Sequence, residues 1–211
     1  MLHSFITADV LLTNTLSQSG TRLGKLDDPN QPYSCLILAA AGLVRLELAS
    51  RIVQYLSSPT VLHAVGQGAL GVEIRTEDLR IKALVTKLIH KPTYLKCLAE
   101  RSLMRTLEGG CSVPIGVETV FLNEEDLVPT LNTSSSCGTD TTIDTGKLQM
   151  IATVVSLDGS RASTVTAVSK DFITCEAEAE SFGQEVARQL VMKGAGEILK
   201  EIGRNKGTSP S

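Results

Sequence analysis

The chain has 211 residues, enough for one large domain or two small ones with a buried core. Its hydrophobic share of 42% and its charged share of 20% are ordinary for a globular protein. A net charge of −3 and an aromatic share of 3% argue against a nucleic-acid binder, which needs a basic surface and stacking side chains. No apolar stretch is long enough to cross a bilayer, and residues 1–12 lack the basic region of a signal peptide.

The first part of the chain contains two strand-like patterns with a helical pattern between them. The apolar run at 34–43 predicts a strand buried on both faces, as in a parallel or mixed sheet. Residues 44–55 predict a helix, and the glycine-rich run at 65–74 predicts a strand that another group approaches closely. These elements cannot cover one another's apolar faces, so we expect partner strands from elsewhere.

Two amphipathic helices are predicted between residues 76 and 107. Thr76 is the predicted N-cap of the first helix, and Pro92 is predicted at the first position of the second. The apolar stripe of the first helix is Ile81, Leu84, Val85 and Leu88. The stripe of the second is Leu95, Leu98, Ala99, Ser102 and Leu103.

The apolar period changes after the second helix. Residues 113–121 predict a strand, and residues 123–146 predict a surface loop rich in Ser and Thr. Residues 148–157 and 162–169 predict a β-hairpin, because an Asp-Gly turn separates them. A final helix is predicted at 177–202. Its apolar face is Ala179, Phe182, Val186, Leu190, Val191 and Ile198.

These elements predict a fold that combines α/β and α+β parts. Residues 1–19 form an N-terminal segment without a recognisable pattern, and residues 20–75 form an incomplete α/β domain with a return strand. Residues 76–205 form a compact α+β domain with a three-stranded antiparallel sheet and three helices. Residues 206–211 form a polar tail.

The cysteines exclude two common kinds of site. They stand at positions 35, 97, 111, 137 and 175, an odd number at long spacings without a CxxC pair. This pattern disfavours a disulfide framework and a zinc site, and the three scattered histidines add no metal-ligand pattern. We therefore expect no metal and a reducing, cytoplasmic location. Cys35 and Cys97 lie on apolar stretches and are expected to be small buried side chains.

Cys111 has an unusual setting, because Gly109 and Gly110 precede it and a strand pattern follows. Two adjacent glycines leave the thiol free of neighbouring side-chain bulk, which suits contact with a large group. A lone cysteine is nevertheless more often a packing residue. Arg101 and Arg105 lie on the polar side of their helix and are expected to pair at the surface with Glu100 or Glu108.

Three stretches together resemble one known family. They are residues 20–27 (GTRLGKLD), residues 38–46 (LAAAGLVRL) with 64–70 (AVGQGAL), and residues 99–101 (AER) with 107–116 (LEGGCSVPIG). In this order and spacing they resemble the porphobilinogen deaminases, also called hydroxymethylbilane synthases. The resemblance is close over residues 20–122 and a matter of pattern over 147–202.

The resemblance implies a transferase of porphyrin and heme biosynthesis. Such enzymes polymerise porphobilinogen into the linear tetrapyrrole hydroxymethylbilane and release ammonia. Cys111 stands at the position of the cysteine that holds a dipyrromethane cofactor through a thioether. Arg22 and Arg45 match arginines that bind acetate and propionate groups, and Gln67 and Gly68 lie in a segment that lines the family's cleft.

The resemblance also implies a sheet like that of periplasmic binding proteins in the incomplete α/β domain. The partners would be porphobilinogen and the growing polypyrrole chain. We expect a cytoplasmic monomer that binds neither nucleic acid nor membrane.

The residue types suit this chemistry. Each pyrrole carries two carboxylates, and arginine is permanently charged and binds a carboxylate through two parallel donors. Cys111 follows a predicted helix C-terminus, where the helix dipole does not favour a thiolate. A single attachment to the strong electrophile left when porphobilinogen loses ammonia does not require an activated thiol.

The sequence departs from the family pattern at its beginning. The family's acid/base aspartate and paired arginines have no counterpart before Gly20, and residues 16–19 stand where another arginine is expected. No catalytic residue is therefore identified, and the chain is expected to correspond to the C-terminal portion of the enzyme. An inactive truncated fragment that serves as a binding or interaction module is the alternative. A small regulatory module is a third reading, which rests on analogy of fold alone.

Overall fold

The computed structural model of the protein describes residues 19–107, 113–122 and 146–206. The chain divides into two compact units, Met1–Ser57 and Ser58–Ser211. The domain boundaries expected from the sequence, 20–75 and 76–205, stay predictions.

The described part of the first unit consists of short helices. They are α1 (Ser19–Asp27), α2 (Ala40–Arg45) and the 3-10 helix η1 (Ala49–Arg51). The apolar side chains buried in this part are Leu23, which is 8% exposed, and Leu43, which is 7% exposed. So little buried apolar surface contributes little to the free energy of unfolding.

Two sequence predictions are wrong in the first unit. The strand expected at 34–43 is not formed, since residues 34–39 are coil and α2 follows. A strand needs a hydrogen-bonded neighbour, and no described residue pairs with this stretch, so Cys35 is exposed and not buried. The helix expected at 44–55 is limited to α2 and η1, because Glu47 adopts a φ of +60° that ends the helical turn.

The second unit is built on the antiparallel sheet that the sequence predicts. Its strands are β1 (Ile115–Leu122), β2 (Lys147–Val155) and β3 (Ala162–Val168), in the order β1-β2-β3. Ile115 pairs with Val154 at one end of the first ladder, and Gln149 pairs with Val168 in the second. Alternate residues of β2 face the helices and are fully buried, namely Leu148, Met150, Ala152 and Val154. The loop predicted at 123–146 lies, apart from Gly146, outside the described residues.

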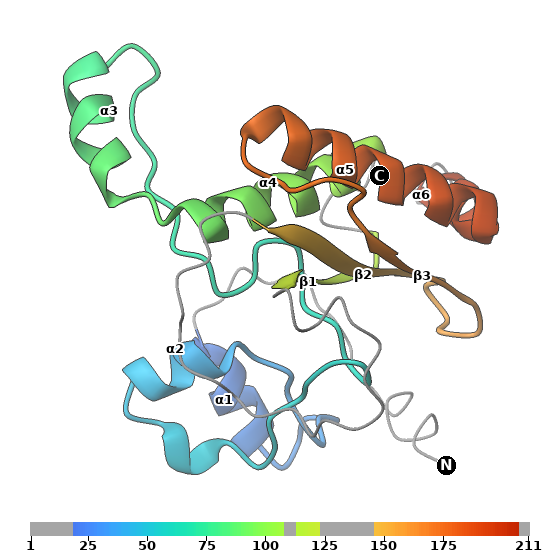
Figure 1. The fold of residues 1–211 in the computed structure, drawn as a ribbon. Helices are drawn as coiled ribbons and strands as arrows, with labels where there is room; N and C mark the ends of the chain where they lie inside the picture. Colours follow the sequence, from blue (N-terminus) through green and yellow to red (C-terminus); the bar gives the residue numbers. More distant parts are fainter. Residues whose placement is uncertain (1–18, 108–112, 123–145, 207–211) are drawn as a thin grey trace, which may run out of the picture. The chain divides into compact units, whose positions relative to one another are not determined.

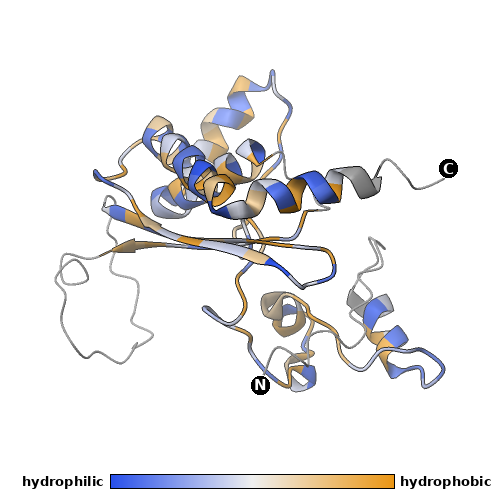
Figure 2. Ribbon diagram, turned by 90° about the vertical axis from the view of Figure 1, so that its right-hand side faces the viewer, coloured by the Kyte–Doolittle hydropathy of each residue, from blue (hydrophilic) through white to orange (hydrophobic). Residues whose placement is uncertain are grey.

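Helices cover one face of this sheet. Figure 1 shows α4 (Lys91–Thr106), α5 (Glu176–Leu190) and α6 (Gly196–Lys206) on the same side of the three strands. Figure 2 shows this layer from the side, with apolar and polar residues alternating along the strands. The predicted α4 stripe is confirmed, because its members are buried or packed against the core. Pro92 stands one position further into the helix than expected, since α4 begins at Lys91.

Helices α4 and α5 cross at unusually close range. A Cβ atom added to Gly183 would lie 2.1 Å from the backbone oxygen of Ala99. Beside this contact, the Ser102 hydroxyl donates to the Glu180 carbonyl at 2.7 Å. The glycine thus permits an approach that any larger residue would prevent.

The helix before α4 has a different environment. Helix α3 (Leu79–Val85) is followed by the 3-10 turn η2 (Thr86–Leu88). Asp78 precedes α3, and its carboxylate accepts from the Ile81 N–H at 2.9 Å. Asp78, rather than Thr76, is therefore the N-cap. The predicted stripe is present in the sequence but does not form a core, because Leu84 is 53% exposed and Leu88 is 76% exposed.

The single helix predicted at 177–202 is interrupted. Between α5 and α6 lies the π-helical segment η4 (Val191–Ala195), in which Gly194 has a φ of +109°. The break turns Val191 outward, so this residue is 46% exposed and the prediction that it belongs to the apolar face is wrong. The break faces β3, where the Lys193 ammonium donates to the Thr164 carbonyl at 2.9 Å.

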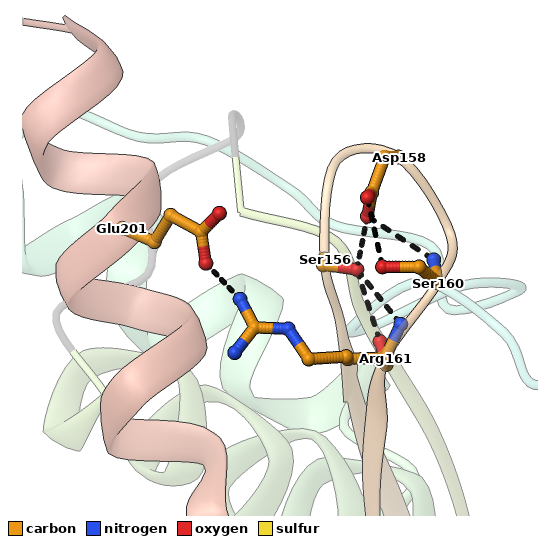
Figure 3. A network of polar contacts seen from close by, with 5 residues as sticks. All are labelled: Ser156, Asp158, Ser160, Arg161 and Glu201. Atoms are coloured by element: carbon orange, nitrogen blue, oxygen red, sulfur yellow. Dashed lines mark hydrogen bonds and ion pairs between the residues drawn. The ribbon is translucent and has the colours of Figure 1, made fainter.

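The turn between β2 and β3 is organised around one carboxylate (Figure 3). Asp158 accepts from the Ser156 hydroxyl at 2.5 Å and from the Ser160 hydroxyl at 2.8 Å. These hydrogen bonds, with that of Ser156 first, lower the pKa of Asp158 from 3.8 to about 2. Arg161 forms an ion pair with Glu201, which joins the turn to α6.

Candidate functional site

Cys111 lies outside the described residues, between α4 and β1. The residues on both sides of this connection belong to the core of the second unit. Helix α4 ends at Thr106, Leu107 is 4% exposed, and Val113 packs against the buried cluster. The described residues that flank the connection carrying Cys111 are therefore held in the core of the second unit.

Gln67 and Gly68 lie in a tight turn and not in a strand. The strand predicted at 65–74 is wrong, because Gly66 and Gly68 adopt φ values of +73° and +88° that extended chain cannot accommodate. Two successive turns result, in which the Gln67 N–H donates to the Ala64 carbonyl at 2.9 Å and the Ala69 N–H donates to the Gly66 carbonyl at 3.2 Å. We call residues 64–69 the glycine turn.

The chain before the glycine turn is attached to β1. His63 and Val117 exchange two backbone hydrogen bonds, with N–O distances of 3.0 and 2.8 Å. Gly116 allows this attachment, because a Cβ at that position would lie 2.9 Å from the Leu62 Cβ. Val65 then packs against the core. One end of the glycine turn is thereby fixed on the strand that follows Cys111.

The glycine turn is also attached to α4. The half-buried carboxylate of Glu100 accepts from the Gly66 N–H at an O–N distance of 2.8 Å. The surface pairing expected of Arg105 with Glu100 is not observed among the described residues, since Arg105 instead lies 4.0 Å from Glu180. Glu108, the other expected partner, lies outside the described residues. Glu100 stands about 10 Å along the helix from Leu107 at 1.5 Å per residue. The glycine turn is thus held by the helix and the strand that flank Cys111.

This arrangement leaves the predicted contact residues accessible. Gln67 and Gly68 are both exposed, so the side-chain amide of Gln67 can donate to an anionic group. A carboxylate is a suitable acceptor for the Gln67 amide N–H groups. Cys111 and the glycine turn both belong to the second unit, so a ligand attached at Cys111 and bound by the glycine turn would contact this unit alone.

The two predicted arginines belong to the first unit. Arg22 lies on α1, where it is half-buried and engaged in an interaction. Arg45 stands in the last turn of α2 and is exposed. The Asp27–Arg51 ion pair, with a separation of 2.5 Å, connects α1 to η1 in the same unit. Both predicted arginines therefore lie on short helices of the first unit, whereas the glycine turn belongs to the second unit.

The other described cysteines are free but have different environments. Burial raises the pKa of the Cys97 thiol, so this side chain stays protonated and inert at neutral pH. Cys175 is exposed at the start of α5. Within the described ranges, no group of His, Cys, Asp and Glu side chains could hold a metal ion. None of the described helices is both long and apolar enough to span a membrane.

Glu100 is the site residue that the sequence did not single out. Its position on the polar side of α4 indicates a solvated charge, and its contact lies 34 residues away in the chain. Unlike a helix N-cap, a hydrogen bond to a backbone N–H so distant in the chain leaves no pattern in a sequence.

Two family models match the chain. The porphobilinogen deaminase dipyromethane cofactor binding domain matches residues 6–83, and the porphobilinogen deaminase C-terminal domain matches residues 94–192. The relative from Yarrowia lipolytica named porphobilinogen deaminase is 50% identical over 186 residues, which is 87% of this chain and 47% of the relative. The relative of the same name from Schizosaccharomyces pombe is 43% identical over 192 residues, 91% of this chain and 52% of the relative. The chain spans about half the length of the curated relatives it matches.

Proposed function

The chain belongs to the porphobilinogen deaminase family, and on this premise we propose that it takes part in the polymerisation of porphobilinogen into hydroxymethylbilane with release of ammonia. Two observations support the proposal. The family models together match most of the chain, and the glycine turn is attached to both elements that flank Cys111. The attachment of the glycine turn is the observation on which the proposed roles of Cys111, Gln67 and Gly68 depend.

Cys111 is the proposed attachment point of a dipyrromethane group, which when bound would supply the end on which the polypyrrole chain grows. The donors in the described residues fit such a group. The exposed Gln67 amide and the exposed Arg45 guanidinium are hydrogen-bond donors, and the carboxylates of the acetate and propionate groups on the pyrroles are acceptors. Arg22 and Arg45 would neutralise carboxylates, while Gln67 and Gly68 would orient the rings near the sulfur.

The location and the assembly state proposed for the chain are those of a cytoplasmic monomer. The free thiols of Cys35, Cys97 and Cys175 suit a reducing compartment. A sheet like that of periplasmic binding proteins around residues 20–75 is proposed from the family resemblance alone. Sedimentation of the purified chain at several concentrations tests the monomer, since a single mass is expected throughout.

Intact-protein mass spectrometry of the chain produced in cells tests the attachment. We expect an added mass of the size of a dipyrromethane on the wild type and none on Cys111→Ser. Cys35→Ser is the matched control, because it removes an exposed thiol outside the proposed site and should retain the addition. An addition that survives Cys111→Ser, or no addition on the wild type, would contradict the assignment of Cys111.

Turnover of porphobilinogen by the purified chain separates attachment from catalysis. Consumption of porphobilinogen with release of ammonia would support an active transferase. Attachment at Cys111 without turnover would favour the alternative, an inactive chain that binds the cofactor or a partner.

A further inference from the structure

We infer that Glu100 is a positioning residue, which holds the glycine turn on α4 and so sets how Gln67 and Gly68 meet a carboxylate-bearing ligand. The part of this inference that concerns the ligand rests on the proposed function. The part that concerns the turn rests on geometry alone, because a charged acceptor binds a backbone N–H at 2.8 Å.

The hydrogen bond between Glu100 and Gly66 joins two segments that lie 34 residues apart in the sequence. Glu100 lies in the middle of a 16-residue helix whose buried side packs on the core, so its own position is fixed. The glycine turn has no such internal support. Its own hydrogen bonds span at most three residues, and an isolated turn of this kind opens readily.

The turn has two other described attachments to the core of the unit, and both lie at its beginning. The His63–Val117 bridge fixes the chain before the turn, and Val65 packs against the core, but Gln67 and Gly68 come after both. The Glu100 carboxylate binds at Gly66, directly before these two residues. Loss of the carboxylate would leave the exposed half of the glycine turn free to rotate about the bridge.

This freedom predicts a particular change in ligand binding. A ligand carboxylate would first have to immobilise the turn, so the concentration needed for half-saturation should rise while the rate at saturation stays similar. Glu100→Gln provides the conservative variant, because its amide oxygen still accepts from Gly66 but carries no charge. Glu100→Ala removes the acceptor.

Amide hydrogen exchange of the full-length chain tests the attachment directly. We expect the Gly66 amide to exchange at least about tenfold faster in Glu100→Ala, with Glu100→Gln between this variant and the wild type. Exchange in β2 and α5 should not change. The matched control is Glu185→Ala, which removes a carboxylate paired locally with Arg188. Equal exchange of Gly66 in wild type and Glu100→Ala would overturn the inference.

The rate of mass addition at Cys111, measured at increasing porphobilinogen concentration, tests the consequence for binding. We expect a half-saturation concentration several-fold higher in Glu100→Ala, a similar limiting rate, and recovery in Glu100→Gln. An unchanged half-saturation concentration would overturn the positioning role. If the wild type gains no mass, the proposed function fails and the ligand part of the inference with it. The exchange of Gly66 still decides whether Glu100 holds the turn.

Discussion

The two units differ in how they bury apolar side chains. In the second unit, the sheet and helices α4, α5 and α6 enclose a core in which Leu95, Leu103 and Leu148 are at most 1% exposed. In the described part of the first unit, burial is limited to Leu23 and Leu43, and Val53 is 99% exposed. An amphipathic pattern forms a core when the chain itself supplies the opposite layer, whereas a strand pattern without a neighbouring strand leaves its apolar residues in water.

Truncation of a leucine in each unit tests this difference with the largest expected effect. Leu103→Ala should lower the free energy of unfolding by about 4 kcal/mol, because the side chain is fully buried in the core of the second unit. Leu43→Ala makes the same chemical change in the first unit and should shift the main transition by less than about 1 kcal/mol. Chemical denaturation followed by circular dichroism measures both. Equal shifts would mean that the units unfold together.

Gly183→Ala tests the close crossing of α4 and α5. The added methyl would lie 2.1 Å from the Ala99 carbonyl oxygen, so the helices must separate, at a cost of about 3 kcal/mol. Gly203→Ala is the control, because Gly203 is exposed on α6 with nothing near its Cβ position and the variant should gain up to about 1 kcal/mol from helix propensity. The two denaturation midpoints should therefore move in opposite directions. A stabilised Gly183→Ala would refute the crossing geometry.

Gly116→Ala tests the attachment of residues 62–63 to β1 within the second unit. Its methyl would meet the Leu62 side chain at 2.9 Å, and the displacement should cost about 1 kcal/mol. The amides of His63 and Val117 should exchange faster in this variant. Gly71→Ala is the control, since nothing lies within 4 Å of its Cβ position. Unchanged exchange of both amides would show that the bridge tolerates the methyl.

A pH titration tests the hairpin turn of the second unit, with the smallest expected effect. The Asp158 carboxyl has a pKa of about 2 in the folded chain and an ordinary value of 3.8 when unfolded. Its contribution to stability is therefore complete above pH 4 and is lost as the pH falls toward 2. The wild type should lose more stability over this range than Asp158→Asn. A carboxyl titration followed by NMR with a midpoint near pH 4 would contradict the hydrogen bonds of Figure 3.

The sequence predicted the parts of the fold that depend on nearby residues. The hairpin follows from the Asp158-Gly159 turn between alternating strands, and the α4 stripe follows from helical spacing. The predictions that failed depended on information outside the local pattern. The strand at 65–74 gives way to positive φ values at two glycines, and the last helix breaks at Gly194, which has a φ of +109°.

The candidate site was predicted only in part, for a similar reason. The motif around Cys111 indicated a family and an anchor, and the matching family models bear out the recognition. The contact from Glu100 to Gly66 joins residues 34 apart through a backbone atom, and residue identities do not encode such a bond. The roles of Arg22, Arg45, Gln67 and Gly68 stay predictions.

The break in the last helix has a consequence for self-association. Strand β3 is an outer strand of the described sheet, and an outer strand with open carbonyl groups is a template on which further copies can stack into fibrils. The Lys193 ammonium occupies the Thr164 carbonyl there. An incoming copy would have to displace this ammonium or bury it in the new interface, and burial of an unpaired charge is costly. A helix that continued without the break at Gly194 would project Lys193 differently and leave the Thr164 carbonyl without this donor.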